Sequence, residues 1–465
     1  MINKSIFRQY DIRGKEGGGE LSPQIFELIG KAYGTYLTRK GIKIAVCGRD
    51  IRATSQEYQQ AAIAGLLSVG IKVINLGVCL TPMMYWAQYF FKSRGGVMIT
   101  ASHNPKGWNG AKLASDYSQT MSGDDLQDIY KMIIESDFVE YAGPGGREET
   151  VDIREEYFED LIGRIDIKNK FKIVVNTGNG TAGPFAPELL QRTGSEIIEH
   201  NIVVDSDYPN YTPNPSEMDM IEDTARVVLE NKADLGFAFD GDGDRLGLVD
   251  ETGQIIWPDQ YLIFLARDLL NKKRGAKIIF DVKSSQAIAD DIEKNGGEAI
   301  MTATGHTNIK RAMKKEGAQL ASELSGHVYI AHNYYGFDDA LFTALSLLEY
   351  FSKENKKVSQ LFASIPQYVS SPGYNATCAD DKKFMVVDEL KKEFKKENYN
   401  VIDIDGARVE FPDLGGWGLV RASNTSGNLT LRFEAKTKDN LKKIEQIFRD
   451  KLARHDFVGK EWIAG

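Results

Sequence analysis

Short apolar runs recur along most of the chain, each followed by a polar turn and a helix-like stretch. Three of these runs open with lysine, and they lie at residues 43–46, 172–175 and 277–280. Each helix-like stretch ends near a glycine and leads to a second apolar run, at 73–74, 197–198 and 299–300. A third run completes each unit, at 97–99, 235–239 and 320–321. Strands alternating with helices predict a largely parallel sheet covered by helices, so we expect three similar α/β units in tandem.

The C-terminal part of the chain has a different pattern. A charged helix is expected at about 381–397 and an amphipathic helix at about 437–454. Apolar runs lie between them, at 401–404, 407–411, 418–421 and 429–433. Short strands in direct succession predict a small α+β domain with an antiparallel sheet. Breaker-rich stretches at 143–146, 251–253 and 370–373 divide the chain into predicted domains at 1–146, 147–252, 253–368 and 369–465.

Composition argues against several classes of protein. The formal net charge is -9 and no basic run is present, which argues against nucleic-acid binding. The N-terminal residues carry charges where a signal peptide needs an apolar core, and no stretch approaches the ~20 apolar residues that cross a bilayer. Cys47 and Cys79 lie in or beside apolar runs and are expected to be buried reduced thiols. We therefore expect a cytoplasmic protein with no nucleic-acid or membrane partner.

Three aspartates at alternate positions form the most distinctive motif. Asp240, Asp242 and Asp244 alternate with glycine between two apolar runs, which predicts a strand, a tight turn and a second strand. Carboxylates on such a turn can direct their oxygens at one hard cation, and their mutual repulsion calls for a positive partner, so we expect a divalent metal. A calcium-binding helix–loop–helix and a solvated acidic turn are the alternatives. Arg245 disfavours the first, because that loop needs glycine at this position.

The turns that follow the third strand of each unit differ in their chemistry. The first unit has T-A-S-H-N-P at 100–105, the second has the acidic turn, and the third has E-L-S-G-H at 323–327. Ligands of open α/β sheets bind beyond the carboxyl ends of strands, so the three turns are expected to face one cleft. Ser102 lacks the G-x-S-x-G frame of a hydrolase. Beside a metal it is interpreted as a phosphoryl carrier, with a loop-capping serine as the alternative.

Further polar loops suit sugar and phosphate ligands. Residues 421–427, R-A-S-N-T-S-G, offer a guanidinium, hydroxyls and an amide to a phosphate, unless they form only a polar hairpin turn. Glu323 and Ser325 can hydrogen-bond vicinal sugar hydroxyls, or belong to an ordinary surface turn. Lys283 and His306 are also candidates for contact with phosphate.

Together these loops resemble the α-D-phosphohexomutase family, in its phosphomannomutase/phosphoglucomutase branch. The motifs F-R-Q-Y-D-I-R-G at 7–14, G-R-D-I-R at 48–52, T-A-S-H-N-P, D-G-D-G-D-R, E-L-S-G-H and R-A-S-N-T occur in the family's order and span the chain. The resemblance implies three similar α/β domains and a fourth, α+β domain similar to the TATA-binding-protein fold, around a central cleft. In order, these domains would carry the phosphoserine, metal, sugar-binding and phosphate-binding loops.

The resemblance also implies roles for residues. Ser102 would be phosphorylated, and Mg2+ would be held by the three aspartates and a serine-phosphate oxygen. The phosphoserine would donate to a hexose 1- or 6-phosphate, and the resulting hexose 1,6-bisphosphate would turn around and rephosphorylate Ser102. The sugar hydroxyls would be held by Glu323 and Ser325, and the other phosphate by Arg421, Ser423, Asn424 and Thr425. Further catalytic residues, with acid–base or charge-stabilising roles near the transferring phosphate, would be Arg13, His103, Lys112 and Arg245. Residues that support substrate binding would be Tyr10, Asn104, Lys283, His306 and His327.

Three positions depart from the family pattern. Gly427 replaces a proline beyond the phosphate loop, Ser322 replaces the glycine that begins the sugar loop, and Leu324 stands where the mannose/glucose branch has methionine. Leucine is close to methionine in size, whereas the phosphoglucosamine branch has glutamine, so mannose and glucose phosphates are favoured. A phosphoglucosamine mutase, a metal-dependent sugar phosphatase and a non-catalytic binding protein are the alternatives, and a monomer or homodimer is expected.

Overall fold

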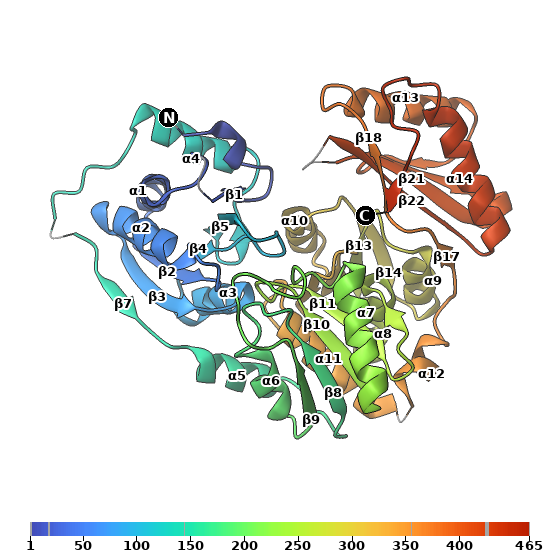
Figure 1. The fold of residues 1–465 in the computed structure, drawn as a ribbon, viewed down its shortest axis with the longest axis horizontal. Helices are drawn as coiled ribbons and strands as arrows, with labels where there is room; N and C mark the ends of the chain where they lie inside the picture. Colours follow the sequence, from blue (N-terminus) through green and yellow to red (C-terminus); the bar gives the residue numbers. More distant parts are fainter. Residues whose placement is uncertain (1, 17–18, 144, 355, 424–426, 465) are drawn as a thin grey trace. The chain divides into compact units, whose positions relative to one another are not determined.

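The computed structural model describes residues 2–16, 19–143, 145–354, 356–423 and 427–464 (Figure 1). The chain divides into two compact units, residues 1–265 with 325–361 and residues 266–324 with 362–465. The first unit holds two α/β domains and parts of the third, at 257–265 and 325–361. The second unit holds the rest of the third α/β domain and the C-terminal domain.

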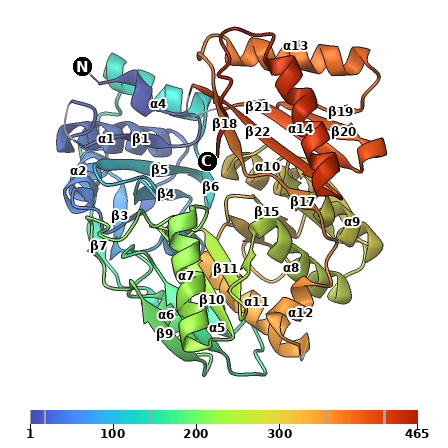
Figure 2. The ribbon, with the colours of Figure 1, turned by 45° about the vertical axis from the view of Figure 1, so that its right-hand side comes forward.

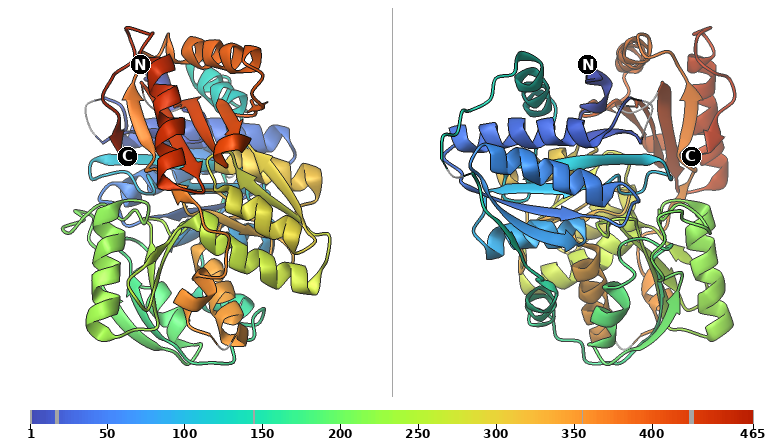
Figure 3. Two further views of the ribbon diagram at one scale, coloured as in Figure 1. Left: turned by 90° about the vertical axis from the view of Figure 1, so that its right-hand side faces the viewer. Right: turned by 60° about the vertical axis from the view of Figure 1, so that its left-hand side comes forward.

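The first α/β domain is built on a mixed sheet with the strand order β1-β5-β4-β2-β3-β7, and β6 pairs with β5. Strands β4, β2 and β3 run parallel, while β5 and β1 are antiparallel to their neighbours. Helices α1 and α2 lie side by side against this sheet (Figure 3, right). A Cβ on Gly30 would lie 2.1 Å from the Ala62 carbonyl oxygen, so glycine permits this close crossing. The elements are η1 (Lys4–Ile6), β1 (Ile12–Lys15), α1 (Pro23–Arg39), β2 (Ile44–Arg49), α2 (Ser55–Ser68), β3 (Lys72–Val78), α3 (Thr81–Phe90), β4 (Gly95–Ile99), β5 (Trp108–Asp116), β6 (Gln119–Thr120), α4 (Asp124–Glu135) and β7 (Glu148–Thr150).

The second α/β domain has the strand order β12-β11-β10-β8-β9. Strands β10, β8 and β9 are parallel, and β11 returns antiparallel to β10, which confirms the predicted strand–turn–strand. Helix α7 packs along β10 and β11 (Figure 2). The elements are α5 (Arg154–Ile162), β8 (Lys172–Asn176), α6 (Ala186–Gln191), β9 (Glu196–His200), α7 (Met218–Asn231), β10 (Leu235–Phe239), β11 (Leu246–Asp250) and β12 (Ile255–Ile256).

The third α/β domain repeats the pattern, with β15, β13 and β14 parallel and in that order. In all three domains the first strand therefore lies between the third and the second, which confirms the predicted tandem units. The elements are α8 (Pro258–Lys272), β13 (Lys277–Asp281), α9 (Gln286–Lys294), β14 (Glu298–Thr302), α10 (His306–Glu316), β15 (Leu320–Ser322), β16 (Val328–Ile330), α11 (Ala340–Glu354) and α12 (Val358–Phe362).

The C-terminal domain is an antiparallel sheet, β19-β20-β21-β22-β18-β23 with β17 on β22, as the α+β prediction required. Helices α13 and α14 pack on the sheet, and their Phe394 and Phe448 rings lie 5.0 Å apart (Figure 3, left). The short strands β17, β18 and β23 were not predicted. The elements are β17 (Val369–Ser370), β18 (Tyr374–Thr377), α13 (Lys383–Lys396), β19 (Val401–Ile402), β20 (Ala407–Phe411), η2 (Pro412–Leu414), β21 (Gly416–Ala422), β22 (Asn428–Ala435), α14 (Lys438–Leu452) and β23 (Ile463–Ala464).

Two expectations from composition can be compared with the fold. Cys47 and Cys79 are buried and free, as predicted, and so is Cys378. Among the helices of the described residues, none has both the length and the apolar character of a membrane span.

A buried carboxyl at the start of α11 gives the fold a predicted pH dependence. Asp339 accepts hydrogen bonds from Tyr157 and Tyr334 and from the Phe342 amide, which caps the helix. Burial raises the pKa of Asp339 to about 6 against these hydrogen bonds, which lower it. The folded state therefore holds this proton more tightly than the unfolded state. Stability from this group is present below the unfolded pKa near 4 and is lost, by about 3 kcal/mol, as the pH rises to 6 and above.

Asp339→Asn is expected to remove this contribution, because asparagine does not titrate. The melting temperature of the variant minus that of the wild type should rise by several degrees between pH 4.5 and pH 7.5, measured by calorimetry. Asp219→Asn, at an exposed aspartate in the first turn of α7, should show no such rise. A parallel pH profile for wild type and Asp339→Asn would contradict the assignment.

Candidate active site

Ser102 lies in the tight loop between β4 and β5, at the carboxyl end of a buried strand. Its backbone has a φ of 47°, in the left-handed region that few residues other than glycine adopt. The Ser102 amide donates to the Thr100 hydroxyl at 2.8 Å, which helps to fix the turn. The Ser102 side chain is buried, and its Oγ donates to Asp240 Oδ2 at 2.9 Å and lies 3.1 Å from His103 Nδ1. The serine is thus aimed at the acidic turn.

The acidic turn joins β10 to β11 and is shaped by its own backbone. The amides of Asp244 and Arg245 donate to Asp240 Oδ1 at 3.0 and 3.1 Å. A Cβ on Gly241 would lie 2.4 Å from the Ser102 carbonyl oxygen. Glycine is therefore needed for the acidic turn to approach the serine loop so closely.

The three aspartates are fully buried beside one lysine. Lys112 Nζ, on β5, lies 2.9 Å from Asp242 Oδ2 and 2.5 Å from Asp244 Oδ2. Burial alone would lower the pKa of Lys112, but the two carboxylates outweigh it and raise that pKa well above its ordinary value. Burial and the charges of Asp244 and Asp242 raise the pKa of Asp240 well above the ordinary aspartate value. The site therefore holds more negative charge than its lysine neutralises.

The arrangement fits a divalent cation. Oxygens of Asp240, Asp242 and Asp244 lie within 4.8 Å of one another. Oδ1 of Asp242 and Oδ1 of Asp244 are buried, and neither has a hydrogen-bond partner in the described part of the chain. Converging carboxylate oxygens with open lone pairs are the ligands of Mg2+ or Ca2+.

Cationic and imidazole groups border this acidic turn. Arg13, on β1, donates from Nη1 to the Ala101 carbonyl at 2.9 Å and also to the Asn104 side chain. Burial, followed by the charges of Arg245 and Arg13, lowers the pKa of His103 well below its ordinary value, so this imidazole is neutral at pH 7.

His327 lies on the other side of the acidic turn. Arg245 Nε donates to His327 Nε2 at 3.0 Å. The His327 Nδ1 atom lies 3.0 Å from Asp338 Oδ2 and 3.5 Å from Asp244 Oδ1. The imidazole thus bridges the acidic turn to Asp338, a residue that the sequence did not single out.

Two further predicted residues belong to the first unit. Tyr10 is partly exposed and lies between η1 and β1. The Ser325 carbonyl accepts from the Ser216 hydroxyl at 3.1 Å. Ser325 Oγ is buried and makes no hydrogen bond to the described residues.

In the second unit, Lys283 occupies the turn between β13 and α9. Its Nζ lies 3.6 Å from Asp281 Oδ2 and 3.8 Å from Glu323 Oε1. The Lys283 carbonyl accepts from Arg432 at 2.8 Å, which holds the backbone of this turn. His306 is the first residue of α10 and is partly exposed.

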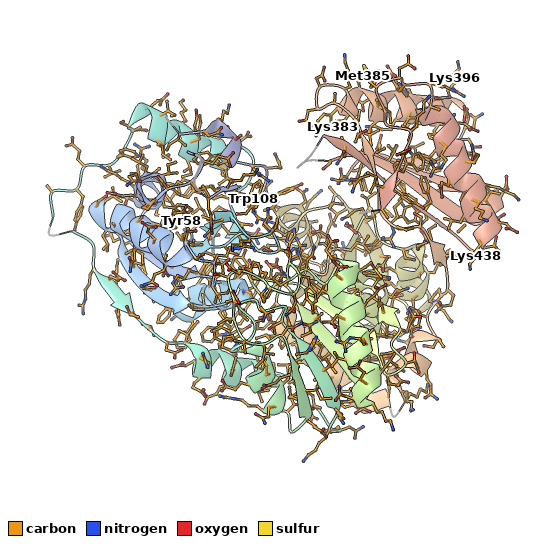
Figure 4. All side chains as sticks on the ribbon, in the orientation of Figure 1. Tyr58, Trp108, Lys383, Met385, Lys396 and Lys438 are labelled. Carbon is orange, nitrogen blue, oxygen red and sulfur yellow. The ribbon has the colours of Figure 1, made fainter. Side chains whose placement is uncertain are left out.

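Arg421 and Ser423 lie at and just beyond the end of β21. Arg421 Nη2 is 3.1 Å from Asp405 Oδ2, and the Ser423 carbonyl accepts from Lys383 Nζ at 2.6 Å. Lys383 is the first residue of α13 and is labelled in Figure 4. Asn424 and Thr425 lie outside the described residues.

Arg408 stabilises the Lys283 turn from β20. Its Nη1 donates to the carbonyls of Val282 and Ser284 at 2.8 and 2.7 Å, and its Cζ lies 3.7 Å from the centre of the Trp417 ring. Burial lowers the pKa of Arg408 to about 10, so it stays charged at pH 7. Arg408→Ala would leave two carbonyls unpaired and a cavity beside the ring.

Arg408→Ala is expected to cost about 3–5 kcal/mol of stability. A lower melting temperature, followed by calorimetry or by the fluorescence of the five tryptophans, checks this. The matched control is Arg454→Ala, since Arg454 is 64% exposed and should contribute little. Equal melting temperatures for the two variants would show that Arg408 does not support the turn.

Comparison with known proteins identifies the family. The models of the four phosphoglucomutase/phosphomannomutase domains match this chain: α/β/α domain I at residues 4–140, domain II at 155–253, domain III at 257–368 and the C-terminal domain at 374–451. The chain belongs to the phosphoglucomutase/phosphomannomutase family.

Relatives and solved structures agree with this assignment. The phosphomannomutase/phosphoglucomutase of Pseudomonas putida is 40% identical over 450 residues, which cover 97% of this chain and 96% of the relative. A crystal structure of a phosphoglucomutase/phosphomannomutase family protein from Burkholderia thailandensis, 36% identical, covers 98% of both chains with a TM-score of 0.91. The Aspergillus fumigatus N-acetylphosphoglucosamine mutase, solved in complex with GlcNAc-6P and magnesium, shares the fold, with a TM-score of 0.62, 14% identity and coverage of 95% and 96%.

In this member of the family, sequence reasoning missed residues that orient the metal-binding group. The hydroxyls of Thr81 and Thr100 donate to Asp242 Oδ2 at 2.6 and 3.2 Å. These hydrogen bonds occupy Asp242 Oδ2, whereas Asp242 Oδ1 has no hydrogen-bond partner among the described residues. Thr81 is the first residue of α3 and belongs to none of the motifs. Thr100 is the first residue of T-A-S-H-N-P, so that motif could have indicated it.

The structure thus groups the predicted residues within each unit. In the first unit it brings together Arg13, Ser102, His103, Asn104, Lys112, Asp240, Asp242, Asp244, Arg245 and His327. In the second unit it brings Lys283 close to Glu323 and places Arg421 beside Ser423, while His306 lies at the start of α10.

Proposed function

We propose that this chain interconverts the 1-phosphates and 6-phosphates of mannose and glucose through a phosphoserine at Ser102. Hexose phosphate mutase activity follows from 40% identity to a phosphomannomutase/phosphoglucomutase over nearly the whole chain. The observation that carries the mechanism is the Ser102 hydroxyl, 2.9 Å from Asp240 within a buried acidic group with open carboxylate oxygens. A nucleophile at such a site suits phosphoryl transfer, because the chemistry needs positioning and neutralisation of charge.

In the first step the P–Oγ bond of phosphoserine breaks and a P–O bond forms to the free hydroxyl of the hexose phosphate. Asp240, Asp242 and Asp244 would hold Mg2+, which when bound neutralises charge on the transferring phosphoryl group. Lys112 adds a fixed positive charge at the same place. The hydroxyl proton of the sugar is released, and Ser102 Oγ gains one, with His103 Nδ1 and Asp240 within hydrogen-bond reach of that oxygen.

The hexose 1,6-bisphosphate formed in this way then returns its other phosphate to Ser102. This requires the sugar to turn around, so the residues that hold it must accept both orientations. Glu323 and Ser325 are proposed to hold its hydroxyls, with Lys283 and His306 near phosphate. The phosphate that is not transferring would be bound by Arg421, Ser423, Asn424 and Thr425. A free bisphosphate would also activate unphosphorylated enzyme.

A coupled assay with Mg2+ and trace glucose 1,6-bisphosphate tests the proposal. Mannose 1-phosphate and glucose 1-phosphate should be converted to their 6-phosphates at least about ten times more efficiently than glucosamine 6-phosphate is converted, as the near-isosteric Leu324 predicts. Inorganic phosphate, measured in the same samples, should stay constant. Preference for glucosamine phosphate would indicate the phosphoglucosamine branch, and release of phosphate in step with loss of substrate would indicate a phosphatase.

Location and assembly are part of the same proposal. A cytoplasmic enzyme that is a monomer or a homodimer is expected, and light scattering of the purified protein would distinguish the two assemblies.

A further inference from the structure

Arg52 binds the backbone of the loop that carries Ser102. It lies between β2 and α2 and is 4% exposed. Its Nη2 donates to the Ser102 carbonyl at 2.7 Å and to the Asn104 carbonyl at 2.5 Å. Its Nη1 donates to the Pro105 carbonyl at 3.1 Å and to the Trp108 carbonyl at 3.0 Å. One guanidinium therefore binds four carbonyls between Ser102 and the first residue of β5.

The Arg52 side chain is itself held in place on two sides. Its Nε lies 3.3 Å from Asp50 Oδ2, and the Arg52 amide donates to Asp50 Oδ1 at 3.1 Å. Its Cζ lies 5.3 Å from the centre of the Tyr208 ring, which the second α/β domain contributes. Tyr208 is 7% exposed, and its hydroxyl makes no hydrogen bond to the described residues. The ring thus contacts Arg52 through its face, as a cation–π partner.

The hydrogen bonds from Arg52 stabilise a strained backbone conformation at Ser102. The left-handed φ of 47° at Ser102 is unfavourable for a residue with a side chain and persists only where surrounding contacts enforce it. Carbonyls that converge on one cation repel one another unless that cation is present. Without Arg52, the loop would relax and Ser102 Oγ would turn away from Asp240.

We propose that Arg52 is a positioning residue that fixes the conformation of the phosphoserine loop, and that Tyr208 of the second domain helps to hold the Arg52 side chain in place. The inference rests on the proposed phosphoryl transfer through Ser102. It assigns no contact with substrate to Arg52, so substrate affinity should be nearly unaffected by its loss. Lysine should not replace it, because an ammonium group lacks the planar fork that reaches two pairs of carbonyls.

The test compares steady-state kinetics of the wild type, Arg52→Lys, Arg52→Ala and the matched control Arg49→Lys. Arg49 is the last residue of β2, directly before the turn, and among the described residues its side chain donates a hydrogen bond to the Asp50 carbonyl. We expect kcat to fall about 100-fold in both Arg52 variants, the loss that about 1 Å of misplacement produces, with KM changed less than about threefold. Phosphorylation of Ser102 by glucose 1,6-bisphosphate, followed by intact mass, should slow in parallel.

Chemical rescue separates positioning from a general loss of fold. Guanidinium chloride at tens of millimolar should raise the kcat of Arg52→Ala several-fold, whereas sodium chloride at equal ionic strength should not. Tyr208→Leu should lower kcat more than Tyr208→Phe, which keeps the ring. A mutase-active wild type with Arg52→Lys within threefold of its kcat would overturn the assignment. The assignment would also be overturned if the loss of kcat were proportional to the loss of folded protein and guanidinium chloride did not restore it. An inactive wild type would instead refute the proposed function.

Discussion

Replacing Ser102 by alanine is expected to lower kcat by about 10,000-fold or more, because the variant has no atom to carry the phosphoryl group. The measurement combines the coupled mutase assay with intact mass before and after glucose 1,6-bisphosphate. The wild type should gain the mass of one phosphate, and Ser102→Ala should gain none. Binding of hexose phosphate should survive in the variant, since the proposed sugar and phosphate contacts lie elsewhere.

The matched control for this experiment is Ser68→Ala. Ser68 is an exposed serine at the end of α2, and among the described residues its hydroxyl donates to the Gly65 carbonyl. It should keep both the mutase activity and the mass gain. If Ser102→Ala still acquires one phosphate and retains more than about 1% of wild-type turnover, another residue carries the phosphoryl group.

The sequence predicted the strands that lead into the candidate site loops, because the same succession of apolar runs, polar turns and helix-like stretches occurs three times. Short apolar runs predicted β4, β10 and β15, and each prediction was confirmed. The turns after these strands stand out because polar and glycine-rich residues follow directly on a buried run. Very short strands such as β17 and β23 had no such signal, because they form only by pairing with β22 and β18.

Other contacts could not be predicted because they join distant parts of the chain. Ser102 and Asp240 are 138 positions apart, and the sequence predicted only that their turns face one cleft, not the hydrogen bond between the two side chains. No family motif includes Asp338 or Thr81, yet one contacts His327 and the other donates to Asp242. Likewise, no sequence pattern predicts the contact between His200 and Asp223. The His200 Nε2 atom lies 2.6 Å from Asp223 Oδ2, and both residues line a cavity of about 560 Å³. Local periodicity determines which face of an element is buried, whereas tertiary packing decides which polar groups meet.

Buried charge explains why the acidic turn is at once a candidate metal site and a source of instability. Lys112 lies beside Asp242 and Asp244, and burial, followed by repulsion from Asp244 and Asp242, raises the pKa of Asp240. Removing the ion from such a site leaves like charges facing one another in a region of low dielectric. Ligand binding and folding stability should therefore be coupled in this enzyme.

Asp244→Asn tests that coupling and should have the second-largest effect on activity. Removing one of three carboxylates is expected to lower kcat by about 1,000-fold at a fixed Mg2+ concentration, since each ligand neutralises and orients the cation.

In the wild type, chelation by EDTA should abolish turnover and excess Mg2+ should restore it. Binding of Mg2+ to the folded state should raise the wild-type melting temperature, and this rise should disappear in Asp244→Asn. Without metal, the variant should melt no lower than the wild type, because one repulsive charge is gone. Asp219→Asn, at an exposed aspartate of α7, should behave as wild type throughout. Full activity in EDTA would contradict the metal requirement, and an unchanged Mg2+-induced rise in Asp244→Asn would place the cation elsewhere.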